Sequence, residues 1–123
     1  MHWASGNTKG YNNDLAARQN GYRQSMVINQ RGDRQYVTVI QDGARNGTTV
    51  GQTGRYNEAH VDQYGRRNDA VIGQQGYNNY GTSVQTGSNN LAGIAQIGSN
   101  NTATTDQYGN NNGVGVIQVG NGQ

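Results

Sequence analysis

The sequence predicts an all-β protein, a β-solenoid of five turns in which each turn contributes two strands. Three observations predict this fold: a unit that recurs along the chain, alternating inward and outward positions within the unit, and a composition rich in amides and glycine. The chain has 123 residues, with 20 Gly and no Pro, Cys or Phe. Only 31% of the residues are hydrophobic, which excludes an ordinary globular domain with a thick apolar core.

The repeating unit is eleven residues long and reads Gln-x-Gly-x-x-Asn-x-φ-x-φ-x, where φ is an apolar or small residue. The glutamine column occurs ten times without a slip and comprises Gln19, Gln30, Gln41, Gln52, Gln63, Gln74, Gln85, Gln96, Gln107 and Gln118. Glycine follows two residues later, at Gly21, Gly32, Gly43, Gly54, Gly65, Gly76, Gly87, Gly98, Gly109 and Gly120. A second amide follows three residues after that, at Gln24 and Gln35 and then at Asn46, Asn57, Asn68, Asn79, Asn90, Asn101 and Asn112.

Each unit predicts one strand and one bend. The amide, the two φ residues and the next glutamine are two residues apart, which is the period of a strand with one buried face. Such a strand runs from Asn57 to Gln63, and the residues after it, including Gly65, are predicted to form a bend because glycine tolerates positive φ. Ten strands are therefore expected, from 13–19 to 112–118, and Gln123 would supply the amide at which a next strand begins.

Successive strands must face each other, because each bend reverses the chain. At the second φ position, alternate units carry large β-branched residues, namely Ile28, Val50, Ile72, Ile94 and Val116. The other units carry smaller residues on average, namely Ala17, Val39, Val61, Ser83 and Thr105. This asymmetry predicts two stacked sheets with a structural repeat of 22 residues.

The predicted core is thin, and hydrogen-bonded rows of Gln and Asn side chains complete it. Its apolar members are Ile28, Val39, Val50, Val61, Ile72, Ile94 and Val116. The amides are therefore predicted to be structural. Because ten is an even number, the first and last strands are expected in opposite sheets, so that copies of the chain stack head to tail.

The solenoid is predicted to span residues 8–123, with residues 1–7 outside the repeats. Residues 1–6 have no apolar signal core, so we expect a secretory signal to have been removed or never to have existed. No apolar run approaches the roughly 18 residues that a membrane-spanning helix needs.

Four segments carry a tighter pattern, Gln-x-Gly-x-x-Asn-x-Ala, at residues 52–59, 63–70, 85–92 and 96–103. This pattern resembles the curlin repeat of bacterial curli subunits, and the resemblance extends over residues 8–123. It implies a subunit more like the major fibre subunit than the nucleator. Such a protein is secreted unfolded through an outer-membrane pore and polymerises on a nucleator into extracellular amyloid fibres of the biofilm matrix. The nucleator itself is the alternative within the family.

No group of side chains predicts catalysis, a cofactor site or a metal site. The histidines are His2 and His60, and the closest acidic pair on one strand, Glu58 and Asp62, has no recurring pocket nearby. We therefore expect no enzyme activity, no cofactor and no metal. The predicted partners are copies of the chain itself.

Positive charge is concentrated in the first half of the chain. Up to residue 67 there are nine cationic and five acidic residues, a net charge of +4, whereas Asp69 and Asp106 make the remainder −2. Arginines at bend positions, such as Arg34 and Arg45, could bind a polyanion. We favour the simpler interpretation that this charge keeps fibres soluble and apart.

An ice-binding solenoid is a less favoured alternative, because it would need an unbroken outward row of threonines. The relevant column holds Thr38, Thr49, Thr82 and Thr104, interrupted by Val27, His60, Val71 and Gly93.

Overall fold

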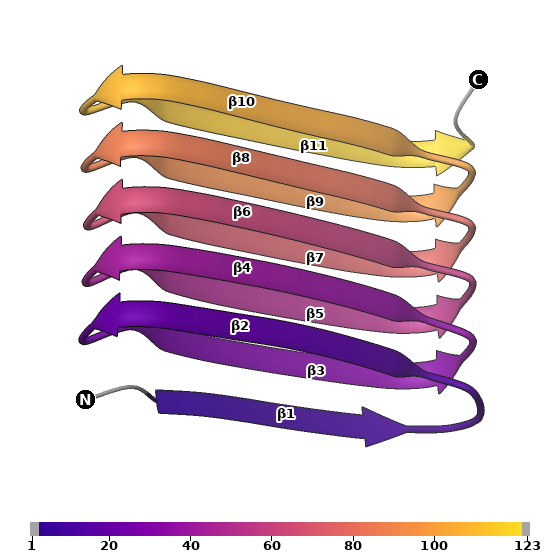
Figure 1. The fold of residues 1–123 in the computed structure, drawn as a ribbon. Coiled ribbons are helices and arrows are strands. Elements are labelled where there is room, and N and C mark those ends of the chain that lie inside the picture. Colours follow the sequence, from indigo (N-terminus) through magenta and orange to yellow (C-terminus); the bar gives the residue numbers. More distant parts are fainter. Residues whose placement is uncertain (1–2, 122–123) are drawn as a thin grey trace.

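A computed structural model describes residues 3–121 and consists of eleven β-strands joined by tight turns (Figure 1). The strands are β1 (Trp3–Lys9), β2 (Asp14–Tyr22), β3 (Ser25–Asp33), β4 (Tyr36–Ala44), β5 (Gly47–Arg55), β6 (Glu58–Arg66), β7 (Asp69–Tyr77), β8 (Tyr80–Ser88), β9 (Leu91–Ser99), β10 (Thr102–Asn110) and β11 (Gly113–Asn121). The described residues include no helix long and apolar enough to cross a membrane.

The strands form two parallel sheets that face each other. The six-stranded sheet has the order β1-β3-β5-β7-β9-β11, and the five-stranded sheet has the order β10-β8-β6-β4-β2. In Figure 1 the odd-numbered strands point one way and the even-numbered strands the other, and the chain climbs from β1 at one end of the stack to β10 and β11 at the opposite end. The predicted β-solenoid is therefore confirmed.

Neighbouring strands pair in the register that the repeat predicts. In the six-stranded sheet Gln52 lies opposite Gln74, and in the five-stranded sheet Gln63 lies opposite Gln85, so each pair is 22 residues apart. The large β-branched set and the smaller set occupy different sheets, because odd-numbered and even-numbered strands never pair with each other. The predicted 22-residue repeat is confirmed.

The strands extend further than the sequence predicts. Gly65, predicted to lie in a bend, is part of β6, and every glycine of its column likewise lies within a strand. Gly65 has a φ of 120°, and a Cβ atom added there would lie 2.0 Å from the carbonyl oxygen of Gly87. The chain therefore begins to curve inside the strand, where successive turns stack too closely for any side chain.

The first strand is the main difference from the expected architecture. Residues 3–7 lie outside the predicted solenoid, yet β1 pairs with β3 along its whole length, from Trp3 opposite Ser25 to Lys9 opposite Arg31. The count is eleven strands and not ten, and the additional strand β1 shares the six-stranded sheet with β11. The first and last expected strands, 13–19 and 112–118, correspond to β2 and β11 and lie in opposite sheets, as predicted. The ten expected strands correspond to β2–β11. The predicted role of Gln123 lies outside the described residues.

Candidate functional site

The glutamine column forms a continuous hydrogen-bonded ladder in each sheet. In the five-stranded sheet the Nε2 atom of Gln41 donates to Oε1 of Gln63 at 2.8 Å, and Gln63 donates to Gln85 at 2.8 Å. The six-stranded sheet repeats this with Gln52, Gln74 and Gln96 at 2.7 and 2.8 Å. The direction is constant, so every link runs from an N–H to the oxygen of the next turn.

Each interior glutamine also joins the two sheets. The Nε2 atom of Gln63 donates a second hydrogen bond to the carbonyl oxygen of Gly47 in β5, at 2.9 Å, and Gln74 donates likewise to Glu58 in β6. Both amide hydrogens are therefore used, and the side-chain oxygen accepts from the previous turn. This satisfies a primary amide that would otherwise be costly to bury.

The structure buries most of the predicted glutamine column. The glutamines from Gln30 to Gln107 are at most 3% exposed, whereas Gln19 and Gln118, in the terminal turns, are only half-buried. Gln19 and Gln118 lie in the edge strands β2 and β11, whereas Gln107 stays buried although β10 is also an edge strand.

The asparagine column works differently from the ladder that the sequence predicts. Within residues 3–121 the asparagine side chains of this column do not bond to each other; Oδ1 of Asn68 accepts the backbone N–H of Asn90 at 3.1 Å. Its Nδ2 atom donates to the carbonyl oxygens of Tyr64 and Gly87, so one side chain closes its own turn and bridges to the next. The shorter side chain keeps the amide beside the backbone. Asn46 to Asn101 are buried in this way and Asn112 is half-buried.

Two positions of this column hold glutamine, and their side chains fit less well. Gln24 and Gln35 are buried and still donate from Nε2 to two backbone carbonyls each. Their Oε1 atoms, however, have no hydrogen-bond partner. The extra methylene group moves the oxygen away from the backbone N–H that an asparagine would reach.

The apolar residues predicted for the core lie between the two amide columns. Ile28, Val39, Val50, Val61, Ile72 and Ile94 are at most 3% exposed and belong to one cluster, and Val116 is half-buried against it. The first φ position adds Met26, Val37, Ala59, Ala70 and Ala103 to the same cluster.

The turns contain a column that the sequence reasoning missed. The second residue after each column glycine from Gly21 to Gly109 has positive φ, between 53° and 63°, as at Arg34, Arg45, Tyr56 and Asn78. Asparagine adopts this left-handed conformation more readily than most residues. The recurrence of asparagine at 78, 89, 100 and 111 was the signal that could have identified the column.

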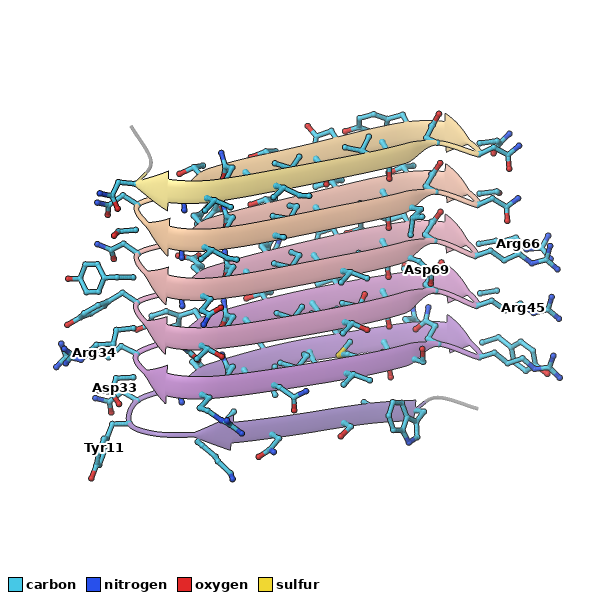
Figure 2. All side chains as sticks on the ribbon, turned by 180° about the vertical axis from the view of Figure 1, so that it is seen from behind. Tyr11, Asp33, Arg34, Arg45, Arg66 and Asp69 are labelled. Carbon is cyan, nitrogen blue, oxygen red and sulfur yellow. The ribbon has the colours of Figure 1, made fainter. Side chains whose placement is uncertain are left out.

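The turn side chains project outward along the two edges of the stack. Arg34 lies on one edge with Asp33 and Tyr11, and Arg45 and Arg66 lie on the opposite edge (Figure 2). Arg34 donates to the hydroxyl of Tyr56 and lies 5.5 Å from the centre of its ring. The positive charge is therefore divided between two edges.

The titratable groups of the described residues do not gather into a catalytic constellation. His60 lies 3.1 Å from Asp62 on the outer face of β6, and residues 3–121 hold no group of three or more His, Cys, Asp or Glu side chains suited to a metal ion. Burial raises the pKa of Asp69, whose strand lies between β5 and β9. These groups give no geometry for acid–base chemistry.

The candidate functional site is instead the pair of unfinished ends of the amide ladders. At the C-terminal end, Gln107 and Gln118 each donate one hydrogen bond from Nε2 within the described residues, to Leu91 and Thr102 respectively, whereas interior glutamines donate two. At the N-terminal end, the buried Oε1 atom of Gln30 has no donor. One end offers N–H groups and the other offers acceptors.

Comparison with known families identifies the repeat. The family model described as the Curlin associated repeat matches residues 32–65, 43–76 and 65–98, which together span more than half of the chain. A comparison with curated proteins found no significant match.

Proposed function

The chain belongs to the curlin repeat family, and from that premise we propose that it is a structural subunit of an extracellular, curli-like amyloid fibre. The observation that carries the proposal is the complementarity of the two ends. Gln107 and Gln118 present unused N–H groups at one end, and Gln19 and Gln30 present side-chain oxygens at the other. Ends that complement each other without closing generate an open filament.

The sheets support the same conclusion. β10 and β11 at one end, and β2 in the five-stranded sheet at the other, are edge strands with one unpaired side each. Unprotected edge strands are templates for the addition of further strands. Identical stacked strands with aligned amide rows are the arrangement that stabilises cross-β fibres.

Within the family we place the chain with the major fibre subunit, and the nucleator is the alternative. The partners implied by this assignment are a nucleator subunit, an outer-membrane secretion pore and further copies of the chain, and the fibre would belong to a biofilm matrix. The role is structural and requires no cofactor.

We do not favour a specific polyanion site at the arginine-rich half. Arg34 and Arg45 lie on opposite edges of the stack, and Arg34 is already engaged with Tyr56 (Figure 2). This distribution favours repulsion between neighbouring fibres. The ice-binding alternative is not favoured either, because His60 interrupts the threonine row between Thr38 and Thr82 in the five-stranded sheet.

The proposal is tested by diluting the denatured chain into buffer and following sedimentation, dye binding and fibre diffraction. We expect filaments with a reflection at about 4.8 Å along the fibre axis. A chain that stays monomeric and β-rich at high concentration would contradict the proposal. Thermal hysteresis in the same samples would instead support ice binding.

A further inference from the structure

The edge of β3 is already covered by β1, and this affects how a second copy can stack. The six-stranded sheet ends in β1 and β11, whereas the five-stranded sheet ends in β2 and β10. If a second copy kept its β1 and placed it on β11, its β2 would lie two strand positions beyond β10. One position in the five-stranded sheet would then be empty, and its backbone groups would lack partners.

Removing β1 from that edge makes the two sheets continuous. The β2 strand of the second copy then pairs with β10 of the first, and its β3 pairs with β11. Each subunit contributes ten strands, β2–β11, and both sheets continue without a gap. On the basis of the proposed filament, we propose that β1 is a built-in cap on the edge of β3, and that β11 of a second copy displaces it when a subunit is added.

The inward residues of β1 are a poorer match to β3 than those of β11. In the shared register, Gly6 lies opposite Ile28 and Thr8 lies opposite Gln30, with both β1 residues exposed. The corresponding residues of β11 are Val116 and Gln118, as its register with β9 shows. The strand from a second copy therefore supplies an apolar side chain and a glutamine where β1 has neither.

The glutamine match is specific at the level of single atoms. Gln30 is 2% exposed and its Oε1 atom lacks a donor, because Thr8 cannot provide the amide N–H that every interior turn provides. Gln118 donates from Nε2 to Thr102 and has a second N–H available at the open end. Stacking β11 on β3 would bring the available N–H of Gln118 to the Oε1 atom of Gln30. This hydrogen bond would run in the same direction as the one from Gln96 to Gln118.

Charge also favours the exchange. Lys9 lies directly opposite Arg31 in the pairing of β1 with β3. Like charges at directly opposed positions destabilise a strand pair. The residue of β11 that corresponds to Lys9 is the uncharged Val119, which lies opposite Ile97 of β9. The backbone pairing of β1 is replaced by equivalent pairing from β11, so these side chains determine which strand is preferred.

A reversible cross-link between β1 and β3 tests the proposal in the full chain. Ser5 and Val27 are directly opposed and point outward, and the chain has no cysteine. The double variant Ser5→Cys/Val27→Cys would lock β1 in place when oxidised and release it when reduced. The matched control is Thr49→Cys/Val71→Cys, which joins β5 to β7 at the same column.

We expect the oxidised Ser5→Cys/Val27→Cys protein to elongate preformed seeds at least about tenfold more slowly than the control, since a locked edge accepts no strand. Reduction should restore the rate. Thr8→Gln, which gives Gln30 a donor within the same chain, should slow elongation without any cross-link.

Equal elongation by the oxidised variant and the control would overturn the cap while leaving the filament intact. Failure of the unmodified chain and of the control to form filaments would overturn both the cap and the proposed function. Faster elongation of Thr8→Gln than of the unmodified chain would also contradict the cap, because that variant holds β1 more firmly.

Discussion

The two edge strands of the six-stranded sheet, β1 and β11, pair with their neighbours in the same register but differ in what they place inside. β11 carries Val114, Val116 and Gln118 in three inward columns, whereas β1 carries the smaller Ala4, Gly6 and Thr8 in the same columns. Backbone pairing therefore accepts a strand that lacks the inward columns of the repeat. The inward columns decide which strand fits best, so stability and assembly should respond to changes in those columns far more than to outward changes.

The largest effect is expected from changing the number of strands. Deleting residues 63–73 removes one unit, which moves every later strand into the other sheet and places the large second-φ residues against the smaller ones. Overpacking and cavities of this kind cost roughly 1–3 kcal/mol or more at each affected position. Deleting residues 63–84 removes a full turn and keeps each strand in its sheet.

We therefore expect the 22-residue deletion to polymerise faster, and to be seeded better by intact filaments, than the 11-residue deletion. Seeded-growth rates of the two deletions, measured side by side, decide this. Equal rates would mean that the two sheets are interchangeable.

A single glutamine replacement makes an interior strand resemble β1. Gln74→Ala removes the donor to Gln96 and to Glu58 and the acceptor for Gln52. Unpaired buried amides should cost about 1–3 kcal/mol and lengthen the lag before filaments form.

Gln75→Ala is the matched control, because Gln75 is the next residue and its side chain is exposed. Lag times and denaturation midpoints of the two variants should differ clearly. If Gln75→Ala were as damaging as Gln74→Ala, the inward columns would not have the role assigned to them.

A smaller, stabilising effect is expected where the asparagine column is imperfect. Gln24→Asn and Gln35→Asn should place a side-chain oxygen where the backbone N–H of the next turn can donate to it, as Asn46 does for Asn68. Each change removes an unpaired buried oxygen, so we expect a gain of about 1 kcal/mol in the free energy of unfolding. Chemical denaturation of the double variant measures it, and a loss of stability would show that the longer side chain is needed for packing.

The smallest effect is expected at the outward position of Asp69. The same column holds Trp3 in β1 and Gly113 in β11. Burial raises the pKa of Asp69 in this column, so the folded state binds the proton more tightly than the unfolded state. Stability should therefore fall as the pH rises from the ordinary aspartate pKa through the raised value. Asp69→Asn should remove this part of the pH dependence and be slightly more stable at neutral pH, as denaturation at several pH values would show.

The repeat predicted most of this architecture, because each column has one structural role. Gln63, Asn68 and Ile72 each recur at a fixed spacing, and that spacing determines the period, the facing sheets and the register. The strand β1 could not be predicted this way, since Gly6 and Thr8 break the inward columns. Backbone pairing with β3 and a hydrogen bond from Nε2 of Gln19 to the carbonyl oxygen of Trp3 hold this strand in the sheet. The bonding of Asn68 to backbone rather than to other asparagines depends on side-chain length in three dimensions, which the spacing does not encode.

In the proposed filament the columns of one subunit continue into the next, and electron cryomicroscopy of the filaments would show whether they do. With ten strands per subunit and about 4.8 Å per turn, the axial rise per subunit should be about 24 Å, with both sheets continuous across the junction. In such a map Gln118 of one subunit would lie opposite Gln30 of the next. A break in either sheet at the junction, or a rise that does not correspond to five turns, would show that the columns do not continue from one subunit to the next.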